Sequence, residues 1–261
     1  MYKYSHMQRG FSLVELSIVL VILGLLTGGI LAGQSLIRAA ELRTVTTDLQ
    51  KYQTAIRSFQ DKYMALPGDM TNATRFWGVR AVGTNIACQQ TINSYDGTCN
   101  SDGNGQIDYI AGDISLGERF LAWQHLALAG LIEGSYTGAS GSTTSGAHLR
   151  GVNTPPSRLG DAFFSLSHIT SPQSGHANWF DGNYGFNTLW LAGVSGRALR
   201  PDELWSIDNK LDDGKPATGY VFTVKSTGSY APGCTTTDVA STSEYAVTSN
   251  SKLCTGYFVL R

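Results

Sequence analysis

The chain has little charge and no concentrated block of basic residues. Its 261 residues include 19 Lys and Arg against 20 Asp and Glu, which gives a formal net charge of −1 at pH 7. Broad electrostatic binding of nucleic acid depends on a basic face or stripe. We therefore predict no general nucleic-acid binding, which leaves room only for a small local patch.

Motifs of the common enzyme classes are also missing. The sequence contains no nucleophile elbow, P-loop, dinucleotide fingerprint or metalloprotease motif. The histidines lack the spacing of metal ligands, and His125 is expected to pack or to lie on the surface. The scattered histidines are His125, His148, His168 and His176. We predict that the protein is not an enzyme and requires no cofactor.

Cysteine is scarce, and no CxxC pair points to zinc or thioredoxin-like chemistry. The four cysteines are Cys88, Cys99, Cys234 and Cys254. Three pairings are open to them, and buried free thiols are the alternative. Linking Cys88 to Cys99 and Cys234 to Cys254 closes two short loops, and it is the simplest pairing for an exported domain. We predict that pairing.

Low charge is combined with abundant glycine in this composition. The chain has 30 glycines, 15% charged residues and 42% apolar residues. Such a composition is typical of a loop-rich, strand-containing exterior domain. The length suits one compact domain with an N-terminal appendage.

The appendage begins with RGFSLVELSIVLVILGLL, residues 9–26, and residues 16–37 carry no charge. As a helix this uncharged run is about 33 Å long, which is close to the thickness of a bilayer core. Lys3 and Arg9 precede it, so the positive-inside rule keeps the N-terminus cytoplasmic and sends the rest outward. We predict one membrane span in contact with lipid.

Glu15 is the unusual residue of this segment, because a carboxylate in hydrocarbon costs a few kcal/mol. A signal peptide cut near residues 30–32 does not explain it, and neither does a plain signal anchor. A cut between Gly10 and Phe11 would leave the apolar run on the mature chain, with a free amine four residues from Glu15.

These residues resemble the cleavage and methylation segment of type IV prepilins and type II secretion pseudopilins. The resemblance implies that a prepilin peptidase cuts after Gly10 and N-methylates Phe11, and that the apolar helix packs in a filament. Glu15 then matches the glutamate of the family motif. The implied partners are the peptidase, other pilin or pseudopilin subunits and an inner-membrane assembly platform.

Glu15 gains a physical role under this resemblance. Its carboxylate can neutralise the N-terminal amine of Phe11 on a neighbouring subunit, which replaces two isolated charges by a hydrogen-bonded pair. The pair would also set the axial register of the filament.

The segment departs from many major pilins because it has no proline partway along the helix. Its glycines are Gly24, Gly28, Gly29 and Gly33. Each weakens a helix by about 1 kcal/mol relative to alanine, so local melting during assembly does not need proline. The missing proline favours a minor pilin or pseudopilin over a major pilin.

After the membrane span, apolar residues continue at spacings of three and four, which predicts one buried helix face. They are Leu42, Val45, Leu49, Tyr52, Ile56, Phe59 and Tyr63. Pro67 and Gly68 should end this helix after about 55 residues. Asp69 is expected to cap a short helix that Gly78 closes, and Ser115 with Glu118 to form a capping box for another.

Strand-like patterns fill the rest of the chain, at residues 162–169, 183–193, 219–226 and 255–260. We expect one antiparallel sheet. The resemblance implies an α+β pilin-like lollipop in which the long helix packs on this sheet, with short helices and a C-terminal loop closed by Cys234 and Cys254. The expected organisation is a leader at 1–10, a membrane or filament-core helix at 11–37, its amphipathic continuation at 38–66 and an extracytoplasmic globular domain at 67–261.

Two acidic loops could hold calcium. In the first, oxygen-bearing side chains alternate, but Ala111 stands where a calcium loop has its glutamate, and Asp108 or Asp113 would have to substitute. An ordinary Asx-Gly turn is the alternative. The alternating residues are Asn100, Asp102 and Asn104, and the second loop holds Asp208, Asp212 and Asp213. The resemblance also implies calcium for the second loop, because pseudopilins can hold it in a C-terminal loop.

Trp179, Trp190 and Trp205 could form a carbohydrate-binding surface, although burial in the core is the favoured interpretation. Two functions remain. The first is a structural subunit of a filament for secretion, adhesion, motility or DNA uptake, processed in the bacterial inner membrane and placed in a periplasmic or cell-surface fibre. The second is a membrane-anchored extracytoplasmic binding module or adhesin that never polymerises.

Overall fold

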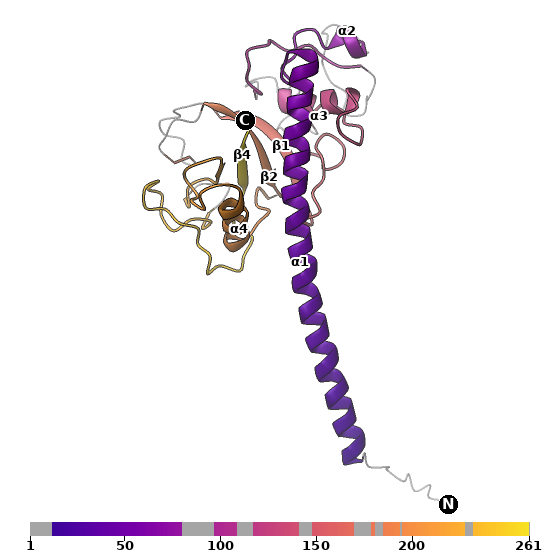
Figure 1. Ribbon diagram of the computed structural model, residues 1–261, viewed down its shortest axis with the longest axis vertical. Helices are drawn as coiled ribbons and strands as arrows, with labels where there is room; N and C mark the ends of the chain where they lie inside the picture. Colours follow the sequence, from indigo (N-terminus) through magenta and orange to yellow (C-terminus); the bar gives the residue numbers. More distant parts are fainter. Residues whose placement is uncertain are drawn as a thin grey trace, which may run out of the picture. The chain divides into compact units, whose positions relative to one another are not determined.

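The computed structural model describes residues 12–79, 97–108, 117–140, 148–169, 179–180, 185–193, 195–227 and 232–260 (Figure 1). The chain divides into two units, Met1–Arg43 and Thr44–Arg261. The first helix, α1 (Leu13–Tyr63), has residues in both units.

In the first unit the described residues form helix, and its large apolar side chains are exposed. The hydroxyl groups of Ser17, Thr27 and Ser35 donate hydrogen bonds to backbone carbonyls of the same helix. Polar side chains in this segment are therefore satisfied locally, as an apolar environment requires.

In the second unit, the last five turns of α1 bury one face. The buried residues are Val45, Leu49, Tyr52, Ala55, Ile56 and Phe59. The Tyr52 ring meets Trp123 and Phe164 edge-on, at centroid distances of 5.0 and 5.1 Å. The predicted apolar face is thus confirmed, and an aromatic contact joins it to the first strand of the sheet.

The helix ends at Tyr63, three residues before the predicted end at residue 66. Gly68 has a φ of +90°, and a Cβ there would overlap the carbonyl oxygen of Glu118. The Gly68 N–H donates to His125 Nδ1 at 3.0 Å, and His125 Nε2 lies 2.9 Å from Thr98 Oγ1. Glycine is required here because the turn approaches another backbone closely. His125 is fully buried, so it takes the first of its two predicted placements, packing in the core.

Two short helices follow, and neither is capped as predicted. Helix α2 (Thr74–Trp77) has Ala73 as its N-cap, and Gly78 closes it as expected. Helix α3 (Glu118–Leu128) has Gly117 as its N-cap, while Ser115 lies outside the described residues. The expected cap by Asp69 is wrong, because its carboxylate accepts N–H groups from residues 104 and 105 instead.

Four strands form one antiparallel sheet in the order β1-β2-β4-β3. They are β1 (Phe163–Ile169), β2 (Phe186–Ala192), β3 (Val221–Phe222) and β4 (Gly256–Val259). β3 is much shorter than predicted. At its end Thr223 leaves the ladder, donating its N–H to Pro216 O and its hydroxyl to Thr255 O.

Helix α4 (Pro201–Leu211) is an element that the sequence analysis missed. Pro201 is its first residue, and the Glu203 carboxylate accepts the N–H of the N-cap Arg200 at 2.9 Å. The Arg200 guanidinium lies 3.5 Å from the same carboxylate. The protein is an α+β protein with a long N-terminal helix and an antiparallel sheet, as predicted.

Candidate functional site

The start of α1 is built around Ser12 and Glu15. The Ser12 N–H donates to Glu15 Oε2 at 2.9 Å, and the Val14 N–H donates to Ser12 Oγ at 3.3 Å. The Ser12 carbonyl accepts the N–H of Leu16 at 3.1 Å. Ser12 is therefore the N-cap and Glu15 the third helical residue, which is the arrangement of a capping box.

This local contact gives the Glu15 carboxylate a partner within its own chain. It also places the negative charge in the first turn, where the helix dipole stabilises it. The pattern Ser-x-x-Glu in the sequence is the signature of this cap, which was not predicted. Gly10 and Phe11, the predicted cleavage and methylation residues, lie outside the described residues.

Helix α1 is the one helix of the described chain that is long and apolar enough to cross a membrane. None of the residues in its most apolar window is buried. Leu20 and Leu31 are 62% and 68% exposed, whereas a soluble protein rarely leaves a contiguous apolar surface of this size uncovered. The first unit therefore carries an apolar surface suited to lipid or to other helices.

The first predicted calcium loop gathers a different set of acids from the one expected. Single carboxylate oxygens of Asp69, Asp102 and Glu118 lie within 4.8 Å of one another. Glu118 accepts the Ser101 hydroxyl and the Asp108 N–H, the latter at 2.7 Å. Asp69 and Glu118 come from separate parts of the chain, so the sequence offered no local pattern that includes them.

The other predicted ligands of that loop serve its internal hydrogen bonds. Asn100 Oδ1 accepts the Thr74 N–H at 2.9 Å, and Asn104 Nδ2 donates to Asp102 and Asp108. Burial raises the pKa of Glu118 to about 7, and the charges of Asp69 and Asp102 add to the rise. Burial likewise raises the pKa of Asp69. Grouped carboxylate oxygens are the donors that hard divalent cations prefer.

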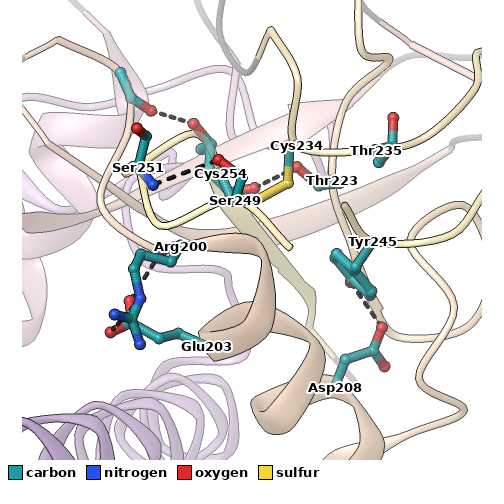
Figure 2. The surroundings of a disulfide bond; sticks show 12 residues. Arg200, Glu203, Asp208, Thr223, Cys234, Thr235, Tyr245, Ser249, Ser251 and Cys254 are labelled. Atoms are coloured by element: carbon teal, nitrogen blue, oxygen red, sulfur yellow. Dashed lines mark hydrogen bonds and ion pairs between the residues drawn. A yellow bond between two sulfur atoms is a disulfide. The ribbon is translucent and has the colours of Figure 1, made fainter. Parts of the chain in front are cut away.

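The second predicted calcium loop brings its three acids together. Oxygens of Asp208, Asp212 and Asp213 lie within 4.8 Å of one another. Asp208 is fully buried and accepts the Tyr245 hydroxyl at 2.7 Å (Figure 2). Burial raises the pKa of Asp208 to about 7, and the neighbouring charges of Asp213 and Asp212 raise it further. Calcium binding at either group stays a prediction.

The Cys234–Cys254 disulfide is present, as predicted, and closes a C-terminal loop (Figure 2). Both cysteines are fully buried, and the Ala246 N–H donates to the Cys234 carbonyl inside the loop. Cys99 is also fully buried, but Cys88 lies outside the described residues, so the link between them stays a prediction.

The three tryptophans do not gather on one surface patch. Trp190 stacks on Tyr257 at 5.9 Å, and Trp179 meets Tyr257 edge-on at 5.0 Å. Trp205 lies on α4 and is 44% exposed. Trp179 and Trp190 thus contact Tyr257 of the sheet but are only half-buried, and Trp205 is exposed, so the expected burial of the three rings in the core is met only in part.

A half-buried histidine completes the aromatic layer on the sheet. His148 stacks on Phe163 at 4.7 Å, and its Nε2 lies 2.9 Å from Ser165 Oγ. Burial lowers the pKa of His148 to about 3, and the charge of Arg119 lowers it further. The imidazole is therefore neutral at neutral pH and packs among the aromatic rings.

The comparison with protein families matches the N-terminus alone. Residues 5–31 match the prokaryotic N-terminal methylation motif, the prepilin-type cleavage and methylation signal of type IV pilins and pseudopilins. Comparison with curated proteins and with solved structures gives no match. The motif supports a precursor of the pilin or pseudopilin type. It also suggests a structural, non-enzymatic protein that prepilin peptidase processes.

Proposed function

We propose that this chain is a minor pilin or pseudopilin, a structural subunit of a type IV pilus or type II secretion filament. Prepilin peptidase removes residues 1–10 and methylates the amine of Phe11. The mature chain resides in the inner membrane, with its N-terminus at the cytoplasmic side, until it is assembled. An assembly platform then transfers it into a periplasmic or cell-surface filament.

One observation carries the proposal. The methylation motif at 5–31 coincides with a continuous helix whose apolar side chains are exposed. At about 25 cal/mol per Å² of apolar surface, leaving such a helix in water is strongly unfavourable, so it needs lipid or neighbouring helices as partners. A filament whose core is made of these helices provides them after extraction from the membrane.

Intact-mass analysis of the membrane-extracted protein tests the proposal. The expected chain starts at Phe11 and carries a methyl group, and it is recovered in sheared filament fractions. A chain that starts at Met1, or one cut near Ala32, would contradict it and favour a membrane-anchored module that does not polymerise.

Gly10→Leu supplies the matched variant, because a bulky side chain keeps the peptidase from the scissile backbone. We expect full-length precursor to accumulate in the inner membrane. Gly10→Ala, which adds one methyl group, should still be processed. Normal processing of Gly10→Leu would refute the assigned cut.

A further inference from the structure

Asn104 and Gly105 form the one Asn-Gly pair in the sequence. In such a pair the backbone nitrogen of glycine can attack the side-chain carbonyl carbon of asparagine, since glycine has no Cβ to obstruct the approach. The bond from the glycine nitrogen to Cγ forms, the bond from Cγ to Nδ2 breaks, and the proton of the glycine N–H leaves with the amide nitrogen as ammonia. Water then opens the cyclic imide to aspartate or isoaspartate.

Solvent can reach this pair, because both residues are exposed. The attacking atom is nevertheless occupied. The Gly105 N–H donates to Asp69 Oδ2 at 2.7 Å, and the Asn104 N–H donates to Asp69 Oδ1 at 3.1 Å. One carboxylate, 36 residues away in sequence, thus holds two consecutive backbone N–H groups.

The side chain of Asn104 is held as well. Its Oδ1 accepts the Gln106 N–H at 2.7 Å, and its Nδ2 donates to Asp102 at 3.0 Å and to Asp108 at 3.2 Å. Turning the carbonyl carbon toward the Gly105 nitrogen would break these contacts. Hydrogen bonds to carboxylates are stronger than bonds between neutral groups, so the folded loop resists the reactive geometry.

We propose that Asn104 is a deamidation site and that Asp69 suppresses its reaction by holding the Gly105 N–H. Asp69 acts as a positioning residue, because it fixes the nucleophile away from the carbonyl carbon. The only co-reactant is water. This inference does not depend on the proposed filament function.

Deamidation would change the loop that it occurs in. The product carboxylate cannot donate to Asp102 and Asp108 as the Asn104 amide does. It would also add a negative charge next to carboxylates that are already close together, and like charges at this separation repel. The modified loop should therefore pack less well than the original.

Peptide mapping of the purified full chain in detergent tests the proposal. Wild type, Asp69→Ala and Asp108→Ala are incubated at mildly alkaline pH, and conversion of Asn104 is followed by mass and by isoaspartate content. We expect Asp69→Ala to react about tenfold faster than wild type, the factor that corresponds to losing one hydrogen bond to a charged group. Asp108→Ala is the comparison variant: it removes one contact of the Asn104 side chain but leaves the Gly105 N–H on Asp69, so its acceleration should be clearly smaller.

The same measurement in urea gives the rate of the unprotected chain, which should be equal for all variants. Asp69→Asn retains the shape and one acceptor oxygen, so it separates loss of the contact from loss of folding, and we expect an intermediate rate. Wild type reacting as fast in buffer as in urea would overturn the proposal. So would wild-type rates in both Asp69 variants, or equal acceleration by Asp108→Ala.

Discussion

The two parts of helix α1 have the same backbone but opposite surroundings. In residues 13–37 large apolar side chains are exposed, whereas in residues 45–59 a regular face is buried against the same unit. Leu20 is 62% exposed and Phe59 is fully buried. One helix therefore pairs its backbone hydrogen-bonding groups along its whole length, while its side chains depend on two different kinds of partner.

The difference has a physical origin in the distribution of polar residues. The first part is apolar on every side, so no single face identifies a partner, and lipid or several helices can cover it. The second part is apolar on one face and charged elsewhere, which suits a single core. Changes in the first part should therefore alter assembly, and changes in the second part should alter stability.

The strongest test of this contrast is the charge at the start of the first part. If Glu15 pairs with the amine of Phe11 on a neighbouring subunit, Glu15→Gln and Glu15→Val should both be processed at Gly10 and yet fail to enter filaments. The capping box makes a different prediction, because glutamine can still accept the Ser12 N–H. Sheared-fibre fractions and N-terminal masses of both variants distinguish the two roles.

A simple anchor would insert Glu15→Val at least as well as wild type, since the change makes the span more apolar. If Glu15→Val assembles as well as wild type, the proposed pair between Glu15 and the Phe11 amine of a neighbouring subunit is refuted. Wild-type assembly of Glu15→Gln alone would assign the residue to helix capping.

Truncating one apolar residue in each part sharpens the contrast. Phe59→Ala removes a fully buried ring and should cost about 3–5 kcal/mol of unfolding free energy. Leu20→Ala removes an exposed side chain and should leave the stability of the second unit unchanged. Urea unfolding of the detergent-solubilised full chain, followed by tryptophan fluorescence, measures both. A comparable loss of unfolding free energy in Leu20→Ala would contradict the assignment of different roles to the two parts of α1.

The disulfide should stabilise only the second unit. Its two cysteines are 20 residues apart, and closing such a loop in the unfolded chain is worth about 3 kcal/mol. Replacing both cysteines by serine should lower the urea midpoint while leaving cleavage after Gly10 intact. Non-reducing peptide mapping also tests the second predicted link, and a crossed pairing of Cys88 or Cys99 with the other pair would contradict it.

His148 predicts a pH dependence confined to the second unit. Its pKa in the folded state is about 3, below the usual value of 6.5, so the unfolded chain binds the proton first as the pH falls. The stabilisation is complete above pH 6.5 and is lost toward pH 3, and by pH 5 the loss reaches about 2 kcal/mol. His148→Gln should remove this loss. Equal pH dependence of both proteins would show that the ring is protonated in the fold.

Glu118 and Asp208 act in the opposite direction, because burial raises their pKa values to about 7. Their contribution is complete at low pH and falls as the pH rises toward 7. Both residues are present in wild type and in His148→Gln, so the difference between the two proteins isolates the histidine.

The smallest expected effect concerns calcium. If either acidic group binds the ion, a concentration tenfold above the dissociation constant should stabilise the folded chain by about 1.4 kcal/mol. Asp102→Asn and Asp208→Asn assign the gain to the first or the second loop. If millimolar calcium leaves the melting temperature of wild type, Asp102→Asn and Asp208→Asn unchanged, neither acidic group binds calcium.

The features that could be predicted from the sequence are those determined by residues close together in the chain. The period of α1, the four strands and the cysteine pair at 234 and 254 all follow from spacing over short stretches. Helix α4 was missed although Pro201 at its first position and two acids behind it are typical start signals. The Ser12–Glu15 cap was missed because the glutamate was considered for its charge alone.

Features that depend on contacts between distant segments could not be predicted. Asp69 follows a helix and precedes another, which suggests a cap, but its carboxylate is captured by backbone groups 35 and 36 residues further on. Glu118 joins Asp69 and Asp102 only because α3 packs beside the turn at Gly68. Such groupings are consequences of tertiary packing, and no local pattern encodes them.

The position of β4 sets the order in which the sheet can form. This strand follows all the others in sequence, yet it lies between β2 and β3 in the sheet. Among the described strands β3 pairs with β4 alone, so it stays unpaired until residues 256–259 have joined the sheet. The sheet therefore cannot be completed from its earlier strands, and formation of the β3–β4 ladder is a late step in the folding of the second unit.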